Sequence, residues 1–99
     1  MPSEQSGSDA QTWFTYILRC ADNSLYTGIA LDVEKRLKEH NGIEKNGAKY
    51  TQARRPVELV YQESSDSRSE ASKRECAIKS LSKAQKEQLI KNIDNKSFY

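Results

Sequence analysis

The sequence is poor in cysteine and holds a single histidine. Its two cysteines, Cys20 and Cys76, lie 56 positions apart. A small secreted domain usually depends on a denser set of disulfides, so we expect two free thiols in a reducing cytoplasm. One histidine and two distant cysteines also argue against a structural zinc site.

Long apolar runs are absent as well. The longest uncharged, apolar-rich run is Thr12–Leu18, well short of the roughly 20 residues that span a bilayer. The N-terminus has no basic segment followed by an apolar one, so no signal peptide is predicted. We therefore expect a cytoplasmic protein with no membrane partner.

The chain has 99 residues, which is the size of one domain. Residues 1–11 hold no aromatic or β-branched residue and are predicted to be a disordered tail. We expect one folded domain over residues 12–91 and a fraying C-terminal tail over residues 92–99.

The formal net charge of +2 hides an uneven distribution. Residues 1–34 carry one basic and five acidic side chains, whereas residues 35–55 carry seven basic and two acidic ones. The last 44 residues are nearly balanced, with eight basic and seven acidic side chains. The basic stretch indicates a phosphate-rich partner, although a solvated lysine-rich face would give the same pattern.

Three segments have the composition of strands, namely Thr12–Cys20, Leu25–Ala30 and Val57–Gln62. The turn residues 21–24 between the first two favour an antiparallel hairpin. In the first segment, Phe14, Tyr16 and Leu18 share one face and Trp13, Thr15 and Ile17 the other, so helices should cover both faces.

Three helices are predicted from capping signals. Asp32 caps a helix over Val33–Asn41 that Gly42 ends. A capping box at Ser67–Glu70 opens a helix over about 69–81, and another at Ser82–Gln85 opens a helix to about Ile90. The order β-β-α-β-α-α indicates an α/β (α+β) fold with a three-stranded antiparallel sheet flanked by helices.

Polar side chains fall on the inward faces of two of these helices. At about 100° per residue, Arg36 and His40 share an arc with Val33 and Leu37. An inward arginine is costly unless an anion meets it, although a snorkelling arginine and a buried, hydrogen-bonded histidine would fit as well. Glu75 lies at the margin of the next helix's apolar stripe, as an ion-pair partner or a metal ligand.

The order and spacing of these residues resemble the GIY-YIG nuclease superfamily. Thr15-Tyr16-Ile17 is similar to the family's first motif and Tyr26-Thr27-Gly28 to its second. The family's helix arginine falls on Arg36, the histidine of some members on His40, and its metal-binding glutamate on Glu75.

The resemblance covers Trp13–Ile90 and is closest to the small, single-domain bacterial branch of the superfamily. Two positions depart from the family pattern: Thr15 stands for glycine and Thr27 for isoleucine. Neither change removes a reacting group.

The resemblance implies hydrolysis of DNA phosphodiester bonds with one divalent metal, Mg²⁺ or in its place Mn²⁺. Glu75 would hold the metal, and Arg36 would stabilise negative charge at phosphorus. Tyr26 is the better candidate for the general base, because the nearby charges of Arg36, His40 and the metal would favour its phenolate. Tyr16 would position the water or phosphate; which tyrosine is the base stays open.

The resemblance also gives roles to the remaining site residues. His40 would hydrogen-bond a tyrosine hydroxyl or the phosphate, and Gly28 would allow a close backbone approach. The DNA backbone would be contacted by the basic stretch, and Tyr50 would stack on a base or pack on the domain. The expected nucleic-acid-binding residues are Lys45, Lys49, Tyr50, Arg54 and Arg55.

The length leaves no room for an attached DNA-binding domain, so we expect low sequence specificity. Choice would come from structured or single-stranded DNA or from a protein partner, RNA stays open as a substrate, and family analogy suggests DNA repair. Two alternatives remain: a non-catalytic nucleic-acid-binding module of the same fold, and a protein-interaction adaptor.

Overall fold

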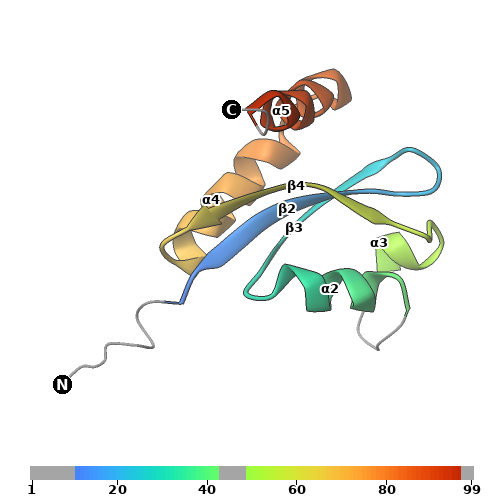
Figure 1. The fold of residues 1–99 in the computed structure, drawn as a ribbon, viewed down its shortest axis with the longest axis horizontal. Coiled ribbons are helices and arrows are strands. Elements are labelled where there is room, and N and C mark those ends of the chain that lie inside the picture. The colour runs from blue at the N-terminus through green and yellow to red at the C-terminus, as the bar shows by residue number, and fades with distance from the viewer. Residues whose placement is uncertain (1–10, 43–48, 97–99) are drawn as a thin grey trace.

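A computed structural model of the chain describes residues 11–42 and 49–96. The elements follow the order β2 (Trp13–Arg19), β3 (Leu25–Ala30), α2 (Val33–His40), α3 (Lys49–Gln52), β4 (Glu58–Ser65), α4 (Arg68–Lys79) and α5 (Lys83–Lys96), as Figure 1 shows. This is the predicted β-β-α-β-α-α order with the four-residue helix α3 added. Within the described ranges, no helix is long and apolar enough to cross a membrane. Residues 1–10 of the predicted tail over residues 1–11 lie outside the described residues.

The three strands form one antiparallel sheet with β2 in the centre, in the order β3-β2-β4. The β2–β3 hairpin closes at a turn where the backbone N–H of Cys20 donates to the carbonyl of Ser24 at 2.9 Å. Asn23 takes φ 69° in that turn, a conformation that asparagine tolerates better than most residues. The register places Tyr16 opposite Gly28.

Strand β4 is longer than the sequence predicted. The predicted end at Gln62 is wrong: β4 continues to Ser65, which pairs with Trp13 at the start of β2. The extra residues are polar, so periodicity did not mark them, but the central strand offers backbone partners along its whole length. The ladder shifts register between Ile17 and Leu18.

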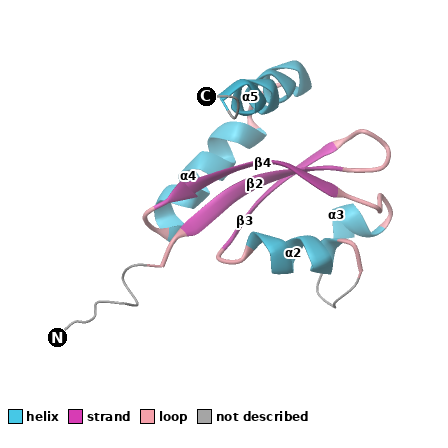
Figure 2. Cartoon of the chain, in the orientation of Figure 1, coloured by secondary structure: helices cyan, strands magenta, loops and turns pink. Residues whose placement is uncertain are grey.

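Helices cover both faces of the sheet, as the alternation in β2 predicted. Tyr16 and Leu18 pack with Val33 of α2 in one core cluster. Ile17 packs with Ile78 of α4 and Ile90 of α5 in the other. Figure 2 shows α2 and α3 on one side of the sheet and α4 and α5 on the other. Both cysteines are free, as predicted, with Cys20 buried and Cys76 exposed.

The predicted helix starts are confirmed. The Asp32 carboxylate accepts from the backbone N–H of Lys35, and the Ser67 hydroxyl accepts from that of Glu70. Ser82 and Gln85 cap α5 reciprocally, each side chain accepting from the other's backbone N–H.

The predicted end of the last helix, at Ile90, is wrong. The helix α5 continues to Lys96, so residues 92–96 of the predicted C-terminal tail are helical. The start of α5 is docked on the sheet, because Arg19 of β2 forms a bidentate ion pair with Glu87, with both N–O distances at 2.7 Å. Lys83 also donates to the carbonyl of Asn23 at 2.9 Å. These tertiary bonds fix the first turns of α5 on the hairpin.

Candidate active site

Tyr16 lies at the centre of the site, on the central strand and only 1% exposed. Its hydroxyl oxygen is 3.0 Å from Nε2 of His40 on α2. Gly28 is directly opposite on β3, and a β-carbon there would meet the Tyr16 hydroxyl and the Tyr26 ring. Glycine is therefore required at this position so that two tyrosines can share one side of the hairpin.

His40 is fully buried in the last turn of α2, as predicted from its inward position. Both ring nitrogens have partners: Nε2 faces Tyr16, and Nδ1 is 2.8 Å from the hydroxyl oxygen of Thr51. Thr51 on α3 is itself fully buried. Thr51 lies in a segment, residues 47–51, that resembles a signature of the small bacterial branch, but sequence reasoning assigned it no role because no helical periodicity turns it toward His40.

His40 is neutral at physiological pH. Burial is the main cause that lowers the pKa of His40 to about 4, and the positive charge of Arg36 is the next. The charge of Glu39 opposes the shift, and that of Arg55 adds to it. The expectation that a cationic His40 favours a phenolate is therefore wrong. The imidazole acts as a neutral hydrogen-bonding group, with one nitrogen donating and the other accepting.

The two tyrosines differ in environment. Burial first, and the neighbouring Tyr26, raise the pKa of Tyr16 to about 12, although Arg36 opposes the shift. Tyr16 therefore stays protonated. Tyr26 is only partly buried, and its ring centroid is 6.5 Å from that of Tyr16 and 5.0 Å from that of His40. Of the two tyrosines, Tyr26 keeps more of its surface exposed to solvent.

Arg36 reaches the same site from α2. Its Nη1 donates to the Glu39 carboxylate at 2.6 Å, and its positive charge acts to lower the pKa of Tyr16 against the larger effect of burial. The side chain keeps 29% of its surface exposed, so the cation is held in place without being sealed off. An anion at the site would meet a positioned guanidinium.

Glu75 approaches from α4, with 23% of its side-chain surface exposed. Its Oε2 pairs with Lys79 one turn later at 3.2 Å, and its charge raises the pKa of Tyr16. Glu75 is therefore close enough to Tyr16 for its charge to act on that tyrosine. The position of Glu75 on its helix did not by itself distinguish an ion-pair partner from a metal ligand. In the described parts of the chain, no three histidine, cysteine or acidic side chains group closely enough to hold a metal ion.

The predicted DNA contacts divide into two groups. Lys45 lies outside the described residues, and only the backbone of Lys49 and Tyr50 is described, in helix α3. The arginines make contacts within the chain: Arg54 Nε pairs with Asp22 at 3.1 Å, and Arg55 Nε donates to the carbonyl of His40 at 2.7 Å.

The chain just after α2 and the chain just before β4 are held together next to His40. The Asn41 side chain accepts from the backbone N–H of Val57 at 2.7 Å and donates to its carbonyl at 3.0 Å. Gly42 takes φ +82°, and a β-carbon there would meet the guanidinium of Arg55. The segment between them therefore starts and ends at fixed points beside His40.

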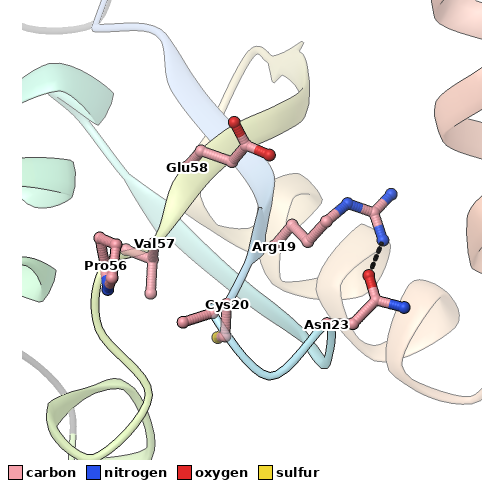
Figure 3. A pocket seen from close by; sticks show the side chains of 7 residues that line it. Arg19, Cys20, Asn23, Pro56, Val57 and Glu58 are labelled. Carbon is pink, nitrogen blue, oxygen red and sulfur yellow. Dashed lines mark hydrogen bonds between the residues drawn. The ribbon is translucent and has the colours of Figure 1, made fainter.

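A surface pocket of about 450 Å³ is formed by the hairpin turn and the chain that leads into β4. Figure 3 shows its lining at the hairpin turn and the start of β4, including Cys20, Val57 and Glu58, with Arg19 hydrogen-bonded to Asn23 at 3.0 Å. None of the predicted catalytic side chains lines this pocket. The volume of this pocket is therefore no guide to the position of the candidate active site.

Comparison with known proteins identifies the class. The family model of the GIY-YIG catalytic domain matches residues 12–88. This chain therefore belongs to the GIY-YIG family, a nuclease superfamily, which confirms the resemblance found in its motifs. Among its relatives, a UPF0213 protein of Desulfotalea psychrophila is 55% identical over 84 residues, covering 85% of this chain and 76% of the relative. A UPF0213 protein of Staphylococcus saprophyticus is 56% identical over 77 residues, covering 78% and 92%.

Two solution structures share the fold. A protein from E. faecalis aligns with a TM-score of 0.57 and 44% identity, over 84% of this chain and 86% of that one. A UPF0213 protein from Bacillus halodurans aligns with a TM-score of 0.52 and 42% identity, over 81% and 83%. The chain is thus similar to small single-domain members of the family, as the sequence indicated.

Proposed function

We propose that this chain is a divalent-metal-dependent DNA endonuclease with low sequence specificity. The observation that carries the proposal is the convergence of side chains from two strands and two helices on Tyr16. The Tyr16 hydroxyl contacts His40, its ring lies beside Tyr26, and both Arg36 and Glu75 act on its pKa. Functional pKa shifts of this kind cluster where charged groups are brought together for chemistry.

Glu75 fits the requirements of a magnesium ion. Mg²⁺ prefers hard oxygen ligands, keeps several waters and often takes only one or two protein carboxylates beside substrate phosphates. A partly exposed carboxylate that pairs only loosely with Lys79 can provide such a ligand. When bound, the metal would supply charge stabilisation at the scissile phosphate and at the leaving oxygen.

Tyr26 acts as the general base, and Tyr16 positions the reacting water or phosphate. The raised pKa of Tyr16 and its burial make that hydroxyl a poor base. Tyr26 is partly exposed and lies on the same side of the hairpin. Its hydroxyl can therefore meet a water that enters from solvent.

Arg36 stabilises the negative charge that develops on phosphorus. Its guanidinium is held by Glu39 on one side and faces the Tyr16 hydroxyl on the other, so it needs little rearrangement when the reaction occurs. His40 holds Tyr16 in place as a neutral partner.

The DNA backbone runs along the part of the basic stretch, residues 35–55, that follows α2 in the sequence. Two contacts of its described residues support this path, since Asn41 bonds Val57 and Arg55 bonds the carbonyl of His40. Backbone contacts carry no base information, so shape, single strands or a protein partner would select the target.

The test is a panel of labelled duplex, single-stranded, flap and branched DNAs, and a matching RNA, incubated with Mg²⁺, Mn²⁺ or a chelator. Wild type should cleave at least one DNA with metal and none with chelator. Arg36→Ala should abolish cleavage, whereas the control Glu34→Ala, at an exposed position of the same helix, should retain it. Cleavage surviving Arg36→Ala would contradict the assigned roles.

The same panel separates the alternatives. Binding that weakens steeply with salt but gives no product would indicate a nucleic-acid-binding module. No binding at low salt would indicate a protein-interaction adaptor.

A further inference from the structure

Thr51 is a fully buried hydroxyl that none of the proposed catalytic roles uses. Buried hydroxyls usually bond to backbone, as Thr15 does when it donates to the carbonyl of Ala71 at 3.0 Å. The Thr51 hydroxyl oxygen lies 2.8 Å from Nδ1 of His40, the ring that holds Tyr16. It therefore touches the site through one intermediate side chain.

The donors along this contact chain can be assigned in order. The positive charge of Arg36 acts on Tyr16 and favours the lone pairs of the Tyr16 oxygen on its side. A phenol is a good donor and a neutral imidazole nitrogen is a good acceptor, which favours the phenolic proton of Tyr16 in its hydrogen bond with Nε2 of His40.

A neutral imidazole carries one proton, and an accepting Nε2 leaves that proton on Nδ1. Nδ1–H then donates to the Thr51 hydroxyl oxygen. The donors thus point in one direction, from Tyr16 through His40 to Thr51.

We propose that Thr51 is a positioning residue: by accepting from Nδ1–H it holds His40 in the Nδ1–H tautomer and so turns the Tyr16 hydroxyl proton away from the substrate. The remaining acceptor capacity of the Tyr16 oxygen then faces the side of Arg36, where it can accept a hydrogen bond from the attacking water and orient it. This catalytic consequence rests on the proposed function, whereas the tautomer does not.

The tautomer can be read directly, because His40 is the only histidine in the chain. In protein labelled with ¹⁵N-histidine, two-bond ¹H–¹⁵N spectra at pH 7 should show Nδ1 protonated and Nε2 unprotonated. Thr51→Ser should preserve this pattern, and Thr51→Val should shift it towards the other tautomer or an exchange average. An Nε2–H tautomer in the wild type would overturn the proposal, whether or not any variant folds.

Thr15→Val is the matched control, since it removes another buried threonine hydrogen bond on the same strand as Tyr16. It should lower stability but leave the His40 spectrum unchanged. If Thr51→Val does not fold, Thr51→Ala removes the same acceptor. An unchanged spectrum in a folded variant that lacks the hydroxyl would also overturn the proposal.

Cleavage kinetics test the consequence for catalysis. Thr51→Val should lower kcat on the order of 10-fold with little change in KM, as loss of a supporting hydrogen bond typically does, and Thr51→Ser should restore it. Normal kcat in Thr51→Val, with an active wild type, would refute the positioning role and leave the nuclease intact. An inactive wild type would refute the proposed function and leave the tautomer assignment standing.

Discussion

Gly28 lies opposite Tyr16 in the β2–β3 ladder, and a β-carbon at Gly28 would be 2.6 Å from the Tyr16 hydroxyl oxygen. Only a residue without a side chain lets that hydroxyl lie over the backbone of the neighbouring strand and still reach His40. The second sequence motif thus has a structural reason for its glycine, independent of any reacting group.

Gly28→Ala should displace the Tyr16 ring and cost about 1–3 kcal/mol, the usual range for overpacking a buried site. Urea unfolding measures the loss, and the His40 resonances should shift because Nε2 loses its partner. Thr27→Ala is the control, since Thr27 faces the other side of the sheet and should leave those resonances in place. Unchanged stability and spectrum in Gly28→Ala would contradict this packing.

Stability should depend on pH through His40. Its folded pKa of about 4 lies below the unfolded value of about 6.5, so the unfolded chain binds the proton first as the pH falls. Stability present above pH 6.5 is therefore lost as the pH drops towards 4, by up to about 3 kcal/mol. The groups responsible besides burial are Arg36 and Arg55, with Glu39 opposing them.

Urea unfolding at pH 7.0 and 5.0 measures this slope, and His40→Gln, which cannot titrate, should flatten it. A His40 resonance that titrates near pH 6.5 in the folded protein would show instead that burial does not hold the ring neutral.

Two chemically identical substitutions on one face of the sheet should have opposite effects. Thr27 is only 3% exposed, and its hydroxyl has no hydrogen-bond partner among the described atoms. The Thr15 hydroxyl, in contrast, donates to the carbonyl of Ala71. Thr27→Val removes an unsatisfied polar group and should stabilise the protein by about 1 kcal/mol. Thr15→Val breaks a buried bond and should destabilise it by a similar amount. Thermal and urea unfolding of both variants decide the signs; a loss of stability in Thr27→Val would reveal a missing partner.

Local signals in the sequence were sufficient for much of the fold. Asp32, Ser67 and Ser82 marked helix starts because capping is a bond between neighbours in sequence. Helical periodicity placed Arg36 and His40 inward because the angle per residue is constant.

Contacts between distant segments were not predictable in the same way. The bond between His40 and Thr51 depends on how the chain returns after the basic stretch, and the extension of β4 depends on a partner 52 positions away at Trp13. The neutrality of His40 also follows from burial and from Arg55, neither of which its own helix reveals.

The proposed metal-dependent cleavage depends most directly on Glu75. The initial rate at which the protein nicks supercoiled plasmid in Mg²⁺ tests this role. Glu75→Gln keeps the shape of the side chain and removes the ligand charge, while Glu70→Gln makes the same change at an exposed position of α4. We predict that wild type and Glu70→Gln nick the plasmid, that chelator stops both, and that Glu75→Gln is slower by about two orders of magnitude or more. Nicking by Glu75→Gln at the wild-type rate, or wild-type nicking that persists in chelator, would contradict it.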